Sequence, residues 1–158
     1  MDDVAALEAA IYDQSFRALD EQARVLDALR ARASALVAGA SVATAFLGGL
    51  AGTTQAGRRD ALTWIAITFF VTAVLLSLLV MTPRVSWVSS HHPHRLIAAY
   101  LKPEPPVSLA TYRRAIAYYN GAHFDANARQ LRWLFRAVAV ASVCLALELV
   151  VWLWILAR

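Results

Sequence analysis

Glu148 is the residue whose type and position most strongly suggest chemistry, because it is a carboxylate inside a run of apolar residues. The run covers 137–157, and Glu148 lies about 11 residues into it, halfway along a helix of bilayer-spanning length. A charge at that depth costs about 3 kcal/mol, so we expect the carboxyl to face protein or water, or to be protonated. Three interpretations remain open: a hydrogen-bond network with hydroxyl groups, an ion-handling group such as one lining an oligomeric pore, and peripheral placement.

Hydroxyl side chains of two earlier apolar runs are expected at a similar depth. They are candidate intramembrane polar partners of Glu148: Ser41, Thr44, Thr68 and Thr72. One of them also belongs to a face of small residues repeated every four positions, Ala40, Thr44, Gly48 and Gly52. Such a face lets helix backbones approach closely. It serves either packing within one chain or self-association between copies.

Other reactive side chains give weaker patterns. His91, His92 and His94 carry imidazoles that bind metals, but no acid or cysteine stands near them and Pro93 bends the backbone between them. We predict no metal site there, and instead a solvated loop beside anionic headgroups. Cys144 has no second cysteine to pair with and is interpreted as a packing residue.

Known catalytic patterns do not occur in the chain. It has no glycine-rich phosphate loop, no GxSxG, no HExxH and no paired-cysteine site. The sequence therefore predicts no catalytic residues, no cofactor and no enzymatic activity. The arginines within 113–136 lack a recognised nucleic-acid module, so we expect anionic lipid and acidic protein groups as their partners and no nucleic acid. The juxtamembrane basic residues are Arg30, Arg32, Arg132 and Arg136.

Three apolar runs must position these side chains. They lie at 33–52, 61–82 and 137–157, and 59% of the chain is hydrophobic, with a mean hydropathy of +0.51. Each run is about as long as a helix that crosses a bilayer. The sequence predicts an all-α integral membrane protein with three transmembrane helices in a single membrane domain.

The basic residues give the predicted orientation. Twelve of them precede the first run or lie between the second and third, against three on the opposite side. By the positive-inside bias the N-terminus is cytoplasmic and the C-terminus outside. A charged segment of 32 residues precedes the first run, which favours an uncleaved anchor. Abundant arginine and alanine are typical of GC-rich bacteria, so we expect the bacterial inner membrane. Three tryptophans are expected at its outer interface, Trp64, Trp152 and Trp154.

Two amphipathic helices are expected to extend the first and third spans into the cytoplasm. The first covers 3–32 and carries an apolar stripe of Val4, Leu7, Ile11, Leu19, Leu26 and Leu29. The second covers 109–136, follows the N-cap Ser108, and carries Leu109, Tyr112, Ile116, Tyr119, Leu131 and Leu134. Between the spans we expect an outer loop at 53–60 and a cytoplasmic loop at 83–108, with an interfacial helix over 93–101.

These two helices are expected to form a parallel pair. Spans one and three run in the same direction, and Arg32 and Arg136 mark their cytoplasmic ends, so the segments align by a simple offset. Residues 1–33 hold seven acids against four arginines, and 82–136 hold eight bases against two acids. The alignment puts Glu8 and Asp13 near Arg113 and Arg114, and Asp27 near Arg129 and Arg132. Pairing within one protomer and pairing between protomers both remain open.

The junction at 26–36, followed by Thr44-Ala45-Phe46-Leu47-Gly48, resembles small bacterial membrane proteins in which a Leu-x-x-Leu-x-x-(Lys/Arg)-Ala helix runs into the first span. The architecture is also similar to the SLATT and Pycsar transmembrane effectors of nucleotide-signalled antiviral systems. The resemblance covers the two helix-to-span junctions and carries over one polar position, Arg32. It implies membrane disruption or pore formation after a cyclic nucleotide is sensed.

We therefore expect a membrane assembly or effector protein, oligomeric and membrane-perturbing, that responds to a cytoplasmic partner or signal. One alternative is an accessory subunit of a membrane complex. The other is a small channel or transporter with Glu148 as its ion-handling group. Expected partners are a bilayer with anionic headgroups, and either further copies of the chain or another membrane or cytoplasmic protein.

Overall fold

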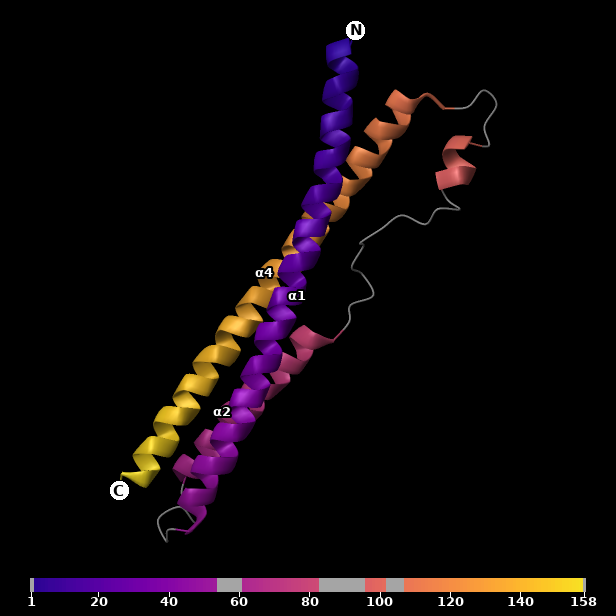
Figure 1. The fold of residues 1–158 in the computed structure, drawn as a ribbon. Helices are drawn as coiled ribbons and strands as arrows, with labels where there is room; N and C mark the ends of the chain where they lie inside the picture. Colours follow the sequence, from indigo (N-terminus) through magenta and orange to yellow (C-terminus); the bar gives the residue numbers. More distant parts are fainter. Residues whose placement is uncertain (1, 54–60, 83–95, 102–106, 158) are drawn as a thin grey trace. The chain divides into compact units, whose positions relative to one another are not determined.

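The structure, a computed structural model, describes residues 2–53, 61–82, 96–101 and 107–157. Its elements are α1 (Asp2–Thr53), α2 (Ala61–Met81), the single turn η2 (Ile97–Leu101) and α4 (Leu109–Leu156) (Figure 1). By length and composition, α1, α2 and α4 each contain a stretch that is long and apolar enough to cross a membrane. The predicted all-helical class and the three candidate spans are therefore confirmed.

α1 and α4 are each one continuous helix. α1 joins the predicted segments 3–32 and 33–52, and α4 joins 109–136 and 137–157. Neither contains a proline that would remove a hydrogen bond, and α4 runs through Gly121 without a break. α4 begins as predicted, because the Thr111 backbone N–H donates to Ser108 Oγ at 3.2 Å, which is the N-cap bond.

Contacts divide the chain into two units. The first unit comprises Met1–Leu26 and Arg84–Leu131, and the second comprises Asp27–Pro83 and Arg132–Arg158. The first contains the beginning of α1, η2 and the beginning of α4. The second contains the remainder of α1 and α4 together with α2.

In the first unit α1 and α4 are parallel neighbours (Figure 1). The side-chain contacts that join them include Glu8 with Arg114, Ser15 with Asn120, and Gln22 with Phe124. The residue numbers rise together along both helices, and the partners are 106, 105 and 102 positions apart. These separations lie close to the offset that Arg32 and Arg136 define in the sequence.

The buried seam of the first unit follows coiled-coil spacing. Successive seam positions are mostly three or four residues apart, which keeps one stripe facing a neighbouring helix. The buried side chains are Leu19, Gln22 and Leu26 of α1, and Ile116, Asn120, Asn127 and Leu131 of α4. Polar residues therefore alternate with leucine and isoleucine along this seam.

In the second unit, many buried residues are alanines, beside a few large ones such as Leu29, Leu134 and Trp152, and many large apolar residues are exposed. The buried positions include Ala33, Ala40, Ala51, Ala66, Ala73, Ala137 and Ala141. The exposed positions include Val42, Phe46, Trp64, Leu75, Val150 and Leu153. Small residues at helix contacts let backbones approach closely, and an apolar exterior of this breadth is typical of a surface that meets lipid or an apolar partner.

All three helices of the second unit meet in one core cluster. It consists of Ala51 from α1, Ala66 from α2, and Trp152 and Ile155 from α4. Gly48 lies against this cluster, and a Cβ placed on it would meet the Trp152 ring at 3.4 Å. The small residues of α1 and α2 therefore make room for one large aromatic side chain from α4.

Part of the connecting chain lies outside the described residues. This applies to most of the predicted outer loop and to His91, His92 and His94. The described part of the predicted helix over 93–101 is a π-helical turn, Ile97–Leu101. Its Tyr100 ring packs edge-on against Tyr112 of α4, with centroids 5.1 Å apart. A residue of the segment predicted to lie at the membrane surface thus contacts α4.

Candidate functional site

Glu148 is completely buried in the second unit, with 0% of its surface exposed. The Thr44 hydroxyl of α1 donates a hydrogen bond to Glu148 Oε1, and the Trp152 indole N–H donates to the same oxygen at 3.3 Å. The other oxygen, Oε2, is buried and has no hydrogen-bond partner among the described residues. The carboxyl is thus a polar link between α1 and α4 that keeps one acceptor unused.

The hydroxyl network around Glu148 is smaller than the sequence suggests. Of the four predicted hydroxyl residues, Thr44 reaches the carboxyl. The others donate at 2.8 Å to backbone carbonyls of their own helices: Ser41 to Val37, Thr68 to Trp64, and Thr72 to Thr68. A hydroxyl in a helix can always bond the carbonyl four residues earlier, so depth alone does not bring it to a partner.

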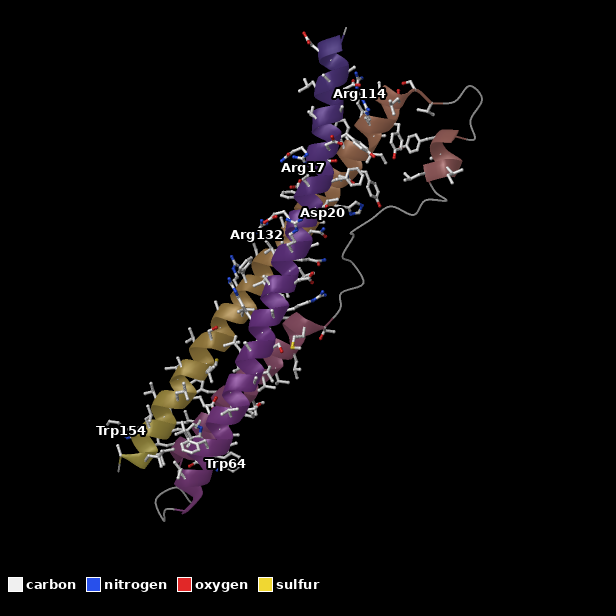
Figure 2. All side chains as sticks on the ribbon, in the orientation of Figure 1. Arg17, Asp20, Trp64, Arg114, Arg132 and Trp154 are labelled. Carbon is white, nitrogen blue, oxygen red and sulfur yellow. The ribbon has the colours of Figure 1, made fainter. Side chains whose placement is uncertain are left out.

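Trp152 is the site residue that sequence reasoning missed. It was assigned to the membrane interface, but it is 4% exposed and its N–H is bonded to Glu148. The available signal was its position four residues after Glu148, since side chains at i and i+4 are neighbours on a helix. Trp64 and Trp154 do project from the second unit as exposed rings (Figure 2).

The geometry favours the hydrogen-bond interpretation of Glu148. Thr44 and Trp152 both donate hydrogen bonds to Glu148 Oε1. These bonds matter because a buried polar group without a partner costs free energy. An ion-handling role requires solvent to reach the carboxyl, whereas the side chain is closed off in this conformation. The arrangement holds two helices in register.

Three residues of the predicted small-residue face pack inside this chain. Ala40 is buried, Thr44 bonds Glu148, and Gly48 lies against Trp152. Gly52 belongs to the last turn of α1. Packing within one chain is therefore the interpretation that the contacts of Thr44 and Gly48 support.

The arginines predicted to lie beside the membrane, Arg30, Arg32, Arg132 and Arg136, differ in their surroundings. Arg30 contacts Asp27 at 3.5 Å on the same helix, whereas Asp27 was expected near bases of α4. An i,i+3 pair forms without aligning two helices. Arg32, Arg132 and Arg136 are exposed, and Arg132 projects outward (Figure 2). Arg32 also lines an open groove of about 430 Å³, together with Ala35, Leu36, Val138, Ser142 and Leu145.

The first unit contains a series of polar contacts between α1 and α4. The Arg114 Nε donates to Glu8 Oε1 at 2.7 Å, so this predicted ion pair is present. Asn120 Nδ2 donates to Ser15 Oγ at 2.9 Å, and Gln22 Nε2 donates to the Phe124 carbonyl at 3.0 Å. The buried amides were not predicted, although the seven-residue spacing of Asn120 and Asn127 is the coiled-coil period.

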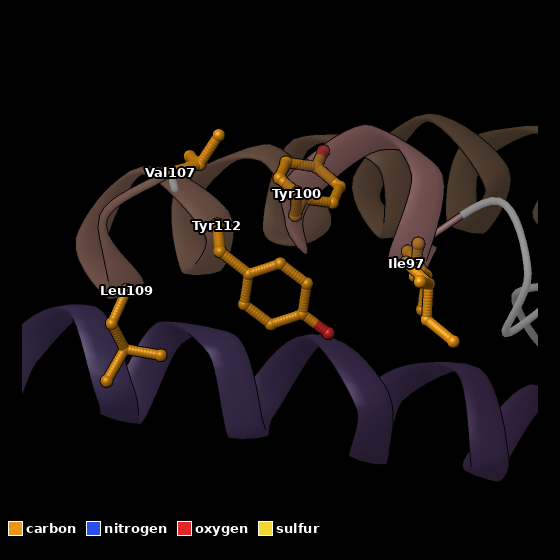
Figure 3. Close-up of a pocket in the computed structure, with 6 residues that line it drawn as sticks. Ile97, Tyr100, Val107, Leu109 and Tyr112 are labelled. Atoms are coloured by element: carbon orange, nitrogen blue, oxygen red, sulfur yellow. The ribbon is translucent and has the colours of Figure 1, made fainter. Parts of the chain in front are cut away.

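η2 and the start of α4 line a half-open apolar pocket of about 310 Å³ in the first unit (Figure 3). Its lining is Leu96, Ile97, Tyr100, Val107, Leu109 and Tyr112. A hydrogen bond with Tyr12, together with burial, raises the pKa of Tyr112 above its ordinary value. Because the folded state prefers the neutral phenol, this contribution to stability is present below about pH 10 and is lost as the pH rises further.

Comparisons with family models, with curated proteins and with solved structures found no match to this chain. Within the described ranges, no group of three His, Cys, Asp or Glu residues is placed to hold a metal ion. Cys144 is buried with a free thiol. The inference of function therefore rests on the helices and their contacts.

Proposed function

We propose that this chain is a non-enzymatic, multi-pass protein of the bacterial inner membrane that acts as an assembly or effector protein. In this proposal the N-terminal half of α1 and the first part of α4 are cytoplasmic and receive a partner or signal. The spans respond by changing how they pack, and the oligomer then perturbs the bilayer. The observation that carries the proposal is that α1 and α4 each contribute to both units and are parallel neighbours in both.

The second unit has the surface expected of the lipid-embedded part. Its exterior carries large apolar side chains and many of its buried positions are alanine, whereas water-soluble helical bundles bury most of their large apolar side chains. Trp64 and Trp154 are exposed on this surface, and indole rings favour the membrane–water boundary. The exposed Arg32, Arg132 and Arg136 suit anionic headgroups.

The first unit has the properties of an adjustable contact in water. Its seam contains buried amides, two of which keep an unpaired oxygen, Gln22 Oε1 and Asn120 Oδ1, among the described residues. Polar seam residues fix register at a cost in stability. Such a pair separates or shifts more readily than an all-leucine seam, which suits a segment that responds to a signal.

The similarity to SLATT and Pycsar effectors agrees with this proposal, since it implies that membrane damage follows a cytoplasmic signal. A second candidate is a small channel or transporter using Glu148, and the unpartnered Oε2 favours it. A structural or accessory subunit of a membrane complex is the remaining alternative. These functions differ in whether the chain changes membrane permeability.

Induced expression in bacterial cells, followed with a voltage-sensitive dye, tests the proposal. We expect depolarisation with the unaltered chain when its signal is present, and a similar effect with Glu148→Gln, which preserves the hydrogen bonds. A matched control is Leu147→Ala, because Leu147 is exposed beside Glu148. Loss of depolarisation in Glu148→Gln alone would support the channel.

A stable partner that co-purifies without any depolarisation would instead identify an accessory subunit. Orientation is checked separately with a reporter fused after Arg158. A reporter active in the cytoplasm would overturn the proposed topology. In that case the arginine bias would have misled the assignment of sides.

A further inference from the structure

α1 carries a second apolar stripe in the first unit, separate from the buried seam. Val4, Leu7 and Ile11 are spaced by three and four residues, and they are 58%, 61% and 51% exposed. By the 100° turn per residue of a helix, the stripe is centred about 60° round α1 from the buried seam residues Leu19, Gln22 and Leu26. Large apolar side chains that recur at coiled-coil spacing on a charged helix indicate a surface that another helix covers.

A shallow groove continues this stripe toward α4. It has a volume of about 540 Å³ and is lined by Ala10, Ile11, Gln14, Ser15 and Ala18 of α1 and by Ala117 of α4. On α4 the small residues Ala110 and Gly121 lie seven positions before and four after Ala117, on the same helical face. A Cβ placed on Gly121 would meet no atom within 4 Å, so this side of α4 is open to a neighbour.

The two helices have opposite charge here. Residues 2–26 contain six acids and two arginines, and residues 109–131 contain three arginines and one acid. Glu8 and Arg114 form the ion pair between them. Within the described part of the first unit, Asp13, Asp20, Arg113 and Arg129 form no ion pair. Unpaired acids on one helix and unpaired bases on the other complement a second copy of the same pair.

We propose that this surface, the α1 stripe with its groove, binds the same surface of a second copy of the chain. The symmetry axis is a twofold parallel to the helices, so that both copies cross the membrane in the same direction. Such an axis places α1 of each copy opposite α4 of the other at equal height. The result is a parallel bundle of four helices in which each acidic helix lies beside a basic one.

The register of the pair fits this arrangement. Glu8 and Arg114 are 106 positions apart, and a parallel twofold keeps that offset between copies. It sets Val4 against Ala110 of the second copy, and Ile11 against Ala117 of the second copy. Large side chains therefore meet small ones, which is how helix surfaces interlock. The proposal relies on the proposed function for one point, the common orientation of both copies.

Light scattering on the full-length chain in detergent measures the number of copies directly. We expect two copies for the unaltered chain, and a twofold drop in protein mass for the variant Leu7→Asp/Ile11→Asp. The control Ala5→Asp/Ala6→Asp adds the same charge at exposed positions outside the stripe, and should remain a dimer. Circular dichroism checks that each variant keeps its helix content. A monomeric unaltered chain, or an unchanged mass in Leu7→Asp/Ile11→Asp, would overturn the proposal.

Disulfide cross-linking in membranes tests the register. Two copies with different tags, both carrying Cys144→Ala, are co-expressed, one with Ile11→Cys and the other with Ala117→Cys. We expect a disulfide that joins the two tags. Asp13→Cys in place of Ile11→Cys is the control, since it lies about 200° round the helix from position 11, and should give at least tenfold less product. Equal yields would contradict the twofold arrangement. Absence of the disulfide would contradict it too, and would mean that lipid or another segment of the same chain covers the stripe.

These readouts separate this inference from the proposed function. The number of copies and the cross-link do not depend on permeability, so depolarisation without a dimer would overturn the interface alone. A dimer without depolarisation would leave the interface standing and would count against the effector.

Discussion

The residues through which α1 contacts α4 differ between the two units. In the first unit, leucine and isoleucine share the seam with buried amides, and the outer surface combines charged residues with exposed apolar and aromatic ones, among them the stripe at Val4, Leu7 and Ile11. In the second unit, alanines and Gly48 lie at the contacts together with a few large side chains such as Leu134 and Trp152, one carboxyl is enclosed, and the outer surface is largely apolar. The same two helices therefore change their packing chemistry along their length.

Under the proposed function, the first unit lies in water and the second in lipid, and these surroundings explain the difference. In water, burying large apolar side chains drives pairing, and a few polar groups set the register. In lipid that driving force between helices is absent, so close packing of small residues and buried polar bonds must hold the helices together. We therefore expect the second unit to depend on shape and the first on a balance of apolar and polar seam positions.

The largest effect is expected from Trp152→Ala, which tests shape in the second unit. It removes the large side chain that fills the core cluster and leaves Glu148 without one of its two donors. Truncating a buried tryptophan costs about 3–5 kcal/mol, so we expect a loss of about 3 kcal/mol in thermal or denaturant unfolding in detergent. Trp154→Ala is the control. Trp154 is 59% exposed, and a loss above about 0.5 kcal/mol there would break the comparison.

Gly48→Leu tests the same packing from α1. A Cβ at Gly48 would already touch the Trp152 ring at 3.4 Å, so a leucine side chain must displace it. Overpacking costs about 1–3 kcal/mol, measured in the same unfolding experiment. The matched control is Gly49→Leu, because a Cβ there meets nothing within 4 Å. If both variants lost equal stability, helix propensity rather than close packing would be responsible.

Variants of the hydrogen-bonded pair Ser15 and Asn120 test the polar seam of the first unit. Ser15→Ala leaves the buried Asn120 Nδ2 without its partner, which we expect to cost about 1 kcal/mol. The double variant Ser15→Ala/Asn120→Leu removes both polar groups and should recover that loss or exceed the original stability. Amide hydrogen exchange of α1 measures both. A double variant less stable than Ser15→Ala would show that the amides do more than set register.

Much of this fold is visible in the sequence. Hydropathy predicts the bounds of α2 to within one residue. The predicted alignment of Arg32 with Arg136 is an offset of 104 positions, and the contacting residues Thr44 and Glu148 are the same 104 positions apart. Helix continuity follows from the lack of prolines in α1 and α4. These predictions are correct because they depend on composition over long segments, so that no single side-chain contact changes them.

The candidate site was less predictable, because it depends on which face of a helix each residue occupies. Depth placed Ser41, Thr68 and Thr72 beside Glu148, but their hydroxyls bond their own helices. Trp152 was assigned by its distance from the end of the span, which says nothing about direction around the helix. Choosing a face requires knowing the neighbouring helices, and that information arises only when three helices pack together.

The smallest expected effect concerns the ion pair that was predicted from the sequence, Glu8 with Arg114. The Arg114 side chain is 65% exposed and that of Glu8 is 13% exposed, so we expect a coupling energy of about 0–1 kcal/mol. A double-mutant cycle with Glu8→Gln and Arg114→Gln measures it, and the coupling should fall as salt rises from low to physiological concentration. Arg113→Gln is the control, because Arg113 forms no ion pair within the described residues. Coupling well above 1 kcal/mol would mean that charge, and not the apolar and amide seam, holds the first unit together, and the contrast between the two units would then be one between electrostatics and shape.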